Sequence, residues 1–320
     1  MNLKFKISFM DQLRFFRHCN FSSGELARIR QILRPNGTTM ILPYDQFIEH
    51  DCRHLEAKSD AGNPDYIINL ALKGQYNAIA IHYGLAKRFW SKYDGQIPLI
   101  LKINGKTSIP SDKHALSTYT SYVEDAVKIG AVAVGYTMYY GSTRQDEDLP
   151  QLATVRKVCE QYGMPLIVWA YPRGEAMEAK GGKDSNYALE SAARLAMEMG
   201  ATIIKSNLPK TAKTDFFENE KVPEYYRNLE KELQTLNPAK QKTERARRVV
   251  SSAQGVPVLF SGGDLIEGSA LDDNSNACIE GGCLGFIYGR NMWKRPENEA
   301  MQMSTELQKL LDSKGKPMFA

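Results

Sequence analysis

Residues 196–207 read AMEMGATIIKSN, an amphipathic segment that reaches Gly200 and passes directly into an apolar run closed by Lys205. Glycine after a helix accepts the left-handed conformation that ends the helix, so this stretch predicts a helix, a tight turn and a strand over 201–205. The run is continuously apolar rather than alternating, which is typical of a strand buried on both faces of a parallel sheet.

The same helix–glycine–strand unit recurs along the chain, with further glycine marks at Gly74, Gly130, Gly163, Gly255 and Gly282. With two additional apolar runs, the expected strands number eight and cover residues 38–44, 77–82, 97–103, 131–137, 164–171, 201–205, 256–261 and 283–288. Helical patterns intervene, one of them capped by Asn63 with Pro64 in its first turn. Eight strands alternating with helices predict an α/β protein with the (β/α)8 TIM-barrel fold. A doubly wound open sheet, which usually needs fewer strands, is the alternative.

We expect one catalytic domain, the barrel, over residues 38–313. Residues 1–37 would form an N-terminal helical extension that packs on the bottom of the barrel or on a neighbouring subunit, and 314–320 a C-terminal tail. The stretch 206–250 is rich in Lys, Glu and Gln and predicts a charged insertion, a solvated helical excursion that includes the basic run 242–248.

Composition narrows the function class. The chain has 320 residues, 42% hydrophobic and 24% charged, with a formal net charge of +4, which suits small anionic metabolites and is too low to indicate nucleic-acid binding. No apolar stretch is long enough for a membrane span, and the N-terminus lacks the features of a secretory signal. The five cysteines include no CxxC pair, which indicates a reducing compartment. We therefore expect a cytoplasmic protein.

Polar residues follow the expected strands at the edge where barrel enzymes carry their chemistry. Ser261, Gly262 and Gly263 follow the seventh strand, and Gly289 and Arg290 follow the eighth. Glycine lets the backbone approach a ligand closely and arginine supplies a fork of donors, so the two loops together predict a phosphate site. Each loop alone could be a simple tight turn.

Lys205 is the candidate nucleophile, because a buried strand tolerates an ammonium poorly while a neutral amine can attack a carbonyl. Lys102, near the end of the third strand, is a second cation that would favour the neutral amine and contact the substrate. Asp45 and Tyr171 supply a carboxylate and a phenol for proton transfer. The alternative is a structural lysine whose ammonium pairs with Asp45 or a phosphate.

A metal site is the main chemical alternative, because His50 and His54 lie four residues apart with acidic neighbours. Zinc usually takes ligands from several strand ends, which the five histidines do not offer. We therefore expect no metal and no other cofactor, with His50 touching the substrate or orienting Asp45.

Seven motifs in order, spread over residues 38–295, resemble the archaeal-type class I fructose-bisphosphate aldolases, a family related to DhnA. They are LPYDQFIEH, LILKINGKT, AVGYTMYYGS, VWAYPRGE, GATIIKSN, VLFSGG and IYGRNMWKRP. The resemblance implies a metal-independent (β/α)8 enzyme that reversibly cleaves fructose 1,6-bisphosphate to dihydroxyacetone phosphate and glyceraldehyde 3-phosphate. It also implies a homo-oligomer built from pentamers.

The resemblance assigns residue roles motif by motif. Lys205 matches the Schiff-base lysine, Tyr171 the proton-transferring tyrosine and Asp45 the carboxylate of strand one. The expected phosphate and substrate contacts are Ser261, Gly262, Gly263, Gly289, Arg290, Trp169 and Arg173. Phe47 and Asp51 stand where the family often has glycine, and Tyr140 where it often has proline, which leaves the shape of the first loop and the role of His50 open.

Two other functions remain open from the sequence. Related Schiff-base barrels perform transaldol-type synthesis, as the 2-amino-3,7-dideoxyheptulosonate synthases do, or act on other ketose phosphates. A sugar-phosphate isomerase or a binding barrel without lysine chemistry is a further alternative.

Overall fold

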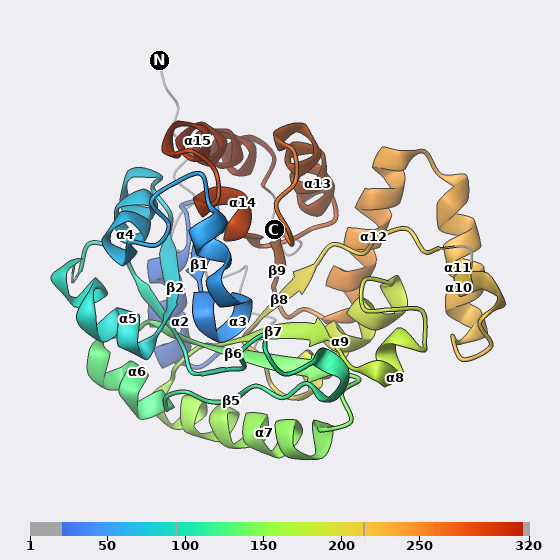
Figure 1. Cartoon of the computed structure of the whole chain (residues 1–320), viewed down its shortest axis with the longest axis horizontal. Helices are drawn as coiled ribbons and strands as arrows, with labels where there is room; N and C mark the ends of the chain where they lie inside the picture. Colours follow the sequence, from blue (N-terminus) through green and yellow to red (C-terminus); the bar gives the residue numbers. More distant parts are fainter. Residues whose placement is uncertain (1–20, 94, 214, 316–320) are drawn as a thin grey trace.

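The computed structural model describes residues 21–93, 95–213 and 215–315. Eight parallel strands close into a barrel in the order β1-β10-β9-β8-β7-β6-β3-β2. Helices surround them, as the ribbon in Figure 1 shows. The predicted TIM-barrel fold is confirmed, and the open sheet is excluded because β1 pairs with both β2 and β10.

All eight predicted strands are present, within three residues of their expected ends. The barrel strands are β1 (Thr39–Tyr44), β2 (Ala78–His82), β3 (Leu99–Lys102), β6 (Ala133–Tyr140), β7 (Leu166–Pro172), β8 (Ile203–Asn207), β9 (Val258–Ser261) and β10 (Gly285–Ile287). Between them lie α3 (Gln46–His50), α4 (Pro64–Lys73), α5 (Tyr83–Arg88), α6 (Val123–Ile129), α7 (Gln145–Tyr162), α8 (Glu175–Glu178), α9 (Asn186–Glu198), α12 (Pro238–Ser252) and α13 (Gly268–Glu280). Two helices, α14 (Arg290–Trp293) and α15 (Glu297–Lys314), follow the last strand. A short antiparallel pair, β4 (Asn104–Gly105) and β5 (Thr118–Tyr119), was not predicted and stands outside the barrel.

Alternation along the strands sorts their side chains into two cores. The outward residues, such as Leu101, Val168 and Ile204, pack against the helices. The inward residues, such as Ile100, Ile167 and Ile203, fill the barrel. Because the period is two residues, Lys102 and Lys205 continue the inward rows that Ile100 and Ile203 begin.

The N-terminal segment plugs one end of the barrel. Helix α2 (Ser23–Ile29) and the 3-10 turn η1 (Arg30–Ile32) place Ile29 and Ile32, both fully buried, against the inward-facing residues. This is the end opposite the predicted site, because Ile203 precedes Lys205 on its strand. Residues 1–20 and 316–320 lie outside the described residues, so the division into extension, barrel and tail stays a prediction.

The glycine marks do end helices, with one difference in detail. Gly130 and Gly163 cap α6 and α7 in the left-handed conformation, with φ of 80° and 55°. After α4, however, Gly74 has φ −75° and the left-handed residue is Gln75, with φ 51°.

Only part of the charged stretch 206–250, after β8, projects away from the barrel. Helix α12 packs between α9 and α13 in the outer layer, while α10 (Asp215–Glu218) and α11 (Glu224–Thr235) project beyond it at one edge of the barrel (Figure 1). The interpretation of 242–248 as a solvated face is wrong at Arg245, which is 1% exposed and makes two hydrogen bonds of 2.6 and 2.7 Å to Glu230 on α11. This buried pair anchors α11 to the barrel.

None of the helices in the described part of the chain is long and apolar enough to cross a membrane.

Gly285 pairs with Thr39 across the β1–β10 junction, so a substitution there tests what closure of the barrel requires. A Cβ on Gly285 would lie 1.9 Å from the backbone oxygen of Thr39, and Gly285 has φ 151°. We expect Gly285→Ala to lower the free energy of unfolding by about 2 kcal/mol or more, because backbone must move to admit the methyl group. The control is Gly84→Ala, where a Cβ meets nothing within 4 Å. Equal unfolding midpoints for the two variants in urea would contradict this explanation.

Candidate active site

The described chain forms a cavity of about 1110 Å³ at the carboxyl ends of the barrel strands. Six of the predicted site residues line it: Tyr171, Arg173, Ser261, Gly262, Gly263 and Arg290. The other predicted residues with described side chains are more deeply buried. Lys205 is 4% exposed and Asp45 7%. The cavity therefore brings the expected phosphate loops and Tyr171 together above a buried amine.

Lys205 lies against two aromatic rings of the neighbouring strand. Trp169 and Lys205 are register partners across β7 and β8, and Nζ of Lys205 lies 4.7 Å from the centre of the Trp169 ring and 5.7 Å from that of Tyr171. Toward the residues that the structure describes, this amine makes no hydrogen bond or ion pair. The structure thus favours a contact with aromatic faces over the alternative of a lysine paired with Asp45.

Trp169 extends across the barrel floor because Gly135 leaves room for it. A Cβ on Gly135 would lie 2.7 Å from the indole and 3.2 Å from Cδ of Lys102. The indole also lies near Lys102, whose Nζ is 5.5 Å from the ring centre. The Trp169 Nε1 is buried and has no hydrogen-bond partner among the described residues.

Lys102 differs from Lys205 in having every donor occupied. Its ammonium lies 3.0 Å from Oε1 of Glu49, 2.7 Å from the backbone oxygen of Asn104 and 3.4 Å from Oδ1 of Asn104. The residue is 0% exposed and lies outside the cavity lining. Lys102 is therefore held by protein groups, and its contact with a substrate stays a prediction.

Glu49 is a site residue that the sequence did not predict. It lies one helical turn after Asp45 on α3 and lines the cavity. Its carboxylate also accepts from Thr137 at 3.3 Å, with the Tyr139 hydroxyl 3.5 Å away. Burial raises the pKa of Glu49 above its ordinary value, while the charge of Lys102 opposes this shift. The available signal was the acidic residue in the motif LPYDQFIEH, which the sequence analysis treated only as a neighbour of His50.

Asp45 and His82 are the buried polar side chains at the ends of β1 and β2. Asp45 occupies the N-cap position of α3 and raises the pKa of Glu49 by its charge. His82 is 6% exposed and lies 3.3 Å from Thr120 Oγ1 through Nδ1, while its Nε2 has no partner among the described residues. Burial, and then the charge of Lys102, lower the pKa of His82 to about 3, so its ring is neutral.

The conformation of Asp51, in the loop after β1, explains why the resembled family often has glycine at this position. Asp51 has φ 56° and ψ −148°, a conformation that glycine adopts with far less strain than aspartate. The backbone of His50 ends α3, but its side chain lies outside the described residues, and its predicted role stays a prediction.

Asn291 braces the two predicted phosphate loops. Its amide donates to the backbone oxygens of Gly262 at 2.9 Å and Asp264 at 2.8 Å, and its Oδ1 accepts from Ile266 N at 3.0 Å. Arg290, after β10, pairs with Asp264, which lies in the loop after β9. Gly262 is needed for this arrangement, since a Cβ there would lie 2.7 Å from Nδ2 of Asn291.

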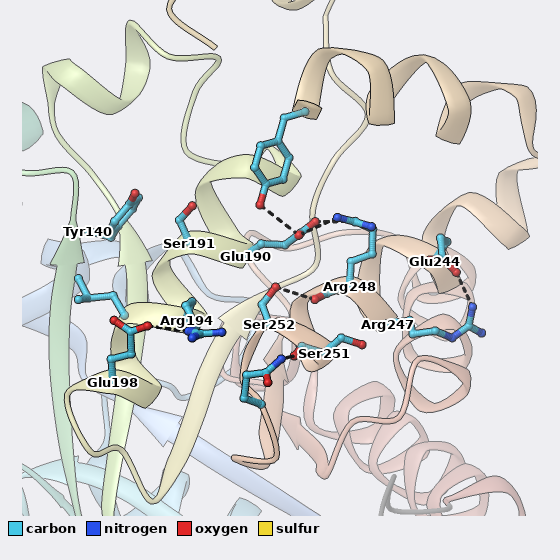
Figure 2. Close-up of a pocket in the computed structure, with 13 residues that line it drawn as sticks. Tyr140, Glu190, Ser191, Arg194, Glu198, Glu244, Arg247, Arg248, Ser251 and Ser252 are labelled. Carbon is cyan, nitrogen blue, oxygen red and sulfur yellow. Dashed lines mark hydrogen bonds and ion pairs between the residues drawn. The ribbon is translucent and has the colours of Figure 1, made fainter. Parts of the chain in front are cut away.

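A second cavity of about 590 Å³ lies outside the barrel, between α9 and α12. Figure 2 shows that each of its arginines is turned toward a glutamate. The pairs are Arg194 with Glu198, Arg247 with Glu244, and Arg248 with Glu190. Because this charge is compensated within the wall, the cavity is a poor site for an anionic substrate, and the barrel cavity is the better candidate.

Comparison with known proteins places the chain. Residues 39–295 match the model of the DeoC/LacD family of aldolases. The chain belongs to this family. The match covers every strand of the barrel, six of the seven motifs and all but Pro296 of the seventh.

Named relatives resemble the chain over most of its length. A fructose-bisphosphate aldolase class 1 of Thermoproteus tenax is 30% identical over 88% of this chain and 92% of its own length. A Methanocaldococcus jannaschii protein, named fructose-bisphosphate aldolase/6-deoxy-5-ketofructose 1-phosphate synthase, is 28% identical over 85% of this chain and 81% of its own.

A solved archaeal fructose-1,6-bisphosphate aldolase, with its catalytic lysine covalently bound to the carbinolamine intermediate of the substrate, aligns with a TM-score of 0.74. It is 28% identical and covers 90% of this chain and 100% of its own. Among the residues of the present chain that the structure describes, no group of three or more His, Cys, Asp and Glu side chains could hold a metal ion.

The buried neutral His82 predicts a stability loss in acid. Its folded-state pKa of about 3 lies below the ordinary 6.5, so the unfolded chain binds a proton first as the pH falls. Between pH 6 and 4 we expect stability to drop by about 1.4 kcal/mol per pH unit relative to His82→Asn, which keeps a polar group near Thr120. Urea unfolding at several pH values measures this difference, and parallel profiles for the two proteins would contradict it.

Proposed function

We propose that the chain is a class I fructose-1,6-bisphosphate aldolase that forms a Schiff base on Lys205. The observation that carries the proposal is the buried amine of Lys205, which points into the barrel beside Trp169 and Tyr171 without a carboxylate partner among the described residues. The named relatives and the solved structure with a lysine-bound intermediate support it.

In the first half of the reaction, the neutral amine of Lys205 attacks C2 of the open-chain ketose. Loss of water from the resulting carbinolamine gives an iminium ion, with Tyr171 as the proton donor to the departing hydroxyl.

In the second half, the C4 hydroxyl gives up its proton and the C3–C4 bond breaks toward the iminium ion. Glyceraldehyde 3-phosphate departs and an enamine remains. Tyr171, reprotonated from solvent water after the first half, donates its proton to C3. Water then hydrolyses the iminium ion, which releases dihydroxyacetone phosphate and restores the amine of Lys205. We assign Asp45 to the C4 proton, since it lies among the buried polar groups at the end of β1.

The two phosphates need separate anchors. Ser261, Gly262, Gly263, Gly289 and Arg290 would hold the phosphate of the dihydroxyacetone half. Arg173, whose guanidinium lies 5.3 Å above the ring of Tyr171, would hold the other. Trp169 would donate from its unpartnered Nε1 to a substrate hydroxyl. His50 and Lys102 complete the proposed substrate contacts.

The resemblance to the archaeal-type family supports three further parts of the proposal. The enzyme would act in the cytoplasm, in glycolysis and gluconeogenesis. It would assemble into a homo-oligomer built from pentamers. It would need no metal.

A second candidate keeps Lys205 and changes the reaction. The Methanocaldococcus jannaschii relative carries a synthase name beside the aldolase name, which favours a transaldol-type reaction as the alternative. Cleavage of fructose 1,6-bisphosphate coupled to triose-phosphate dehydrogenase separates the two, because only the aldolase reaction releases free glyceraldehyde 3-phosphate.

Trapping tests the nucleophile directly. With fructose 1,6-bisphosphate present, we expect borohydride reduction to leave a covalent adduct on Lys205, located by mass spectrometry of peptides. Lys205→Met should show no adduct and at least about 1000-fold lower kcat, because the covalent path is lost. An adduct on another lysine, or activity abolished by EDTA, would contradict the mechanism.

Tyr171→Phe tests the proton shuttle while sparing the amine. We expect kcat to fall by about 100-fold to 10,000-fold, because the phenol is replaced by a ring of nearly the same shape. Borohydride should still trap an adduct on Lys205, more slowly than in the unaltered enzyme. Tyr119→Phe, a partly buried tyrosine on β5, is the control and should keep kcat. A Tyr171→Phe enzyme with unchanged kcat would remove Tyr171 from the mechanism.

A further inference from the structure

Two cations that line the barrel cavity, Lys106 and Arg173, both pair with the carboxylate of Asp112. Asp112 lies in η4 (Asp112–His114), in the loop between β4 and β5. Its Oδ1 is 3.0 Å from Nζ of Lys106, and its Oδ2 is 3.4 Å from Nε of Arg173. One carboxylate thus divides its oxygens between cations from two different loops.

The two cations are fixed in place independently of Asp112. Lys106 also donates to the backbone oxygens of Thr107 at 2.9 Å and Pro110 at 3.1 Å. Arg173 donates to the backbone oxygen of Pro172 at 2.8 Å and lies above the ring of Tyr171. Because these contacts remain when the carboxylate leaves, Lys106 and Arg173 form a preformed anion site in the cavity wall.

Asp112 itself is held loosely. Its side chain is 51% exposed, whereas those of Lys106 and Arg173 are 13% and 22% exposed. A half-exposed carboxylate is rehydrated at small cost when it moves away, and exposed ion pairs contribute little free energy. A phosphate dianion carries more charge and more acceptor oxygens than a carboxylate, so it competes well for the same donors.

We propose that Asp112 is a specificity-determining residue that occupies the site of the substrate's second phosphate and is displaced by it. The inference rests on the proposed function. It adds Lys106 as a second cation beside Arg173 in the anchor of the second phosphate. Asp112 competes with that phosphate for both cations. A sugar with a free hydroxyl at this end leaves Asp112 in place. A sugar with a phosphate there replaces it, so the cavity discriminates between a ketose monophosphate and a ketose bisphosphate.

Kinetics of Asp112→Asn test the proposal, since the amide keeps the size of the side chain and removes its charge. We expect KM for fructose 1,6-bisphosphate to fall by about threefold to tenfold, the range of two exposed ion pairs. KM for fructose 1-phosphate should stay within twofold of the unaltered enzyme. Asp146→Asn, at an exposed position on α7, is the matched control and should change neither KM.

Each other outcome overturns the proposal. A higher KM for the bisphosphate would mean that Asp112 orients the cations instead of competing for them. Equal shifts for both sugars would indicate a general charge effect on the cavity. Unchanged KM values would remove Asp112 from recognition. Because Asp112 is half-exposed, the unfolding midpoint of the variant should match that of the unaltered enzyme and so rule out misfolding.

Calorimetry with inorganic phosphate separates this proposal from the proposed function. We expect Asp112→Asn to bind inorganic phosphate about threefold to tenfold more tightly than the unaltered protein, whether or not the sugar is cleaved. Equal phosphate affinities would overturn the role of Asp112. Tighter phosphate binding together with no cleavage and no borohydride adduct would overturn the aldolase proposal and leave the anion site standing.

Discussion

Closure of the barrel is the constraint on which the rest of the structure depends. The parallel pairing of β1 with β10 joins the first strand to the last and brings all eight carboxyl ends to one side. Within that barrel, the register between neighbouring strands sets Trp169 beside Lys205 and His82 beside Lys102. The junction requires Gly285, where the backbone of Thr39 leaves no space for a side chain.

The two inward lysines show how one barrel gives the same residue type two roles. Lys102 is fully buried and its three donors reach Glu49 and Asn104, so protein groups compensate its charge. Lys205 contacts the aromatic faces of Trp169 and Tyr171 and has no carboxylate partner among the described residues. The difference in partners, and not in burial alone, marks Lys205 as the amine available for chemistry.

The sequence predicted the parts of the site that depend on chain order. A residue at the end of a buried run, such as Lys205 or Ser261, lies at the mouth of a parallel barrel once the strand is identified. Glu49 was missed because its contacts join α3 to β3 and β6, and no local pattern encodes them. Arg245 was misjudged for the same reason: a basic run on a helix looks solvated until α11 supplies Glu230. The contact of Asp112 with Arg173 likewise joins two loops that are far apart in the chain.

The sequence by itself determined the eight strands and the loops that carry Tyr171, Gly262 and Arg290. It could do so because periodicity and helix-ending glycines act over a few residues. Only the tertiary structure decided which charges meet. Neutral His82, the pairing of Lys102 with Glu49 and the aromatic surroundings of Lys205 all depend on distances between strands, which barrel closure sets.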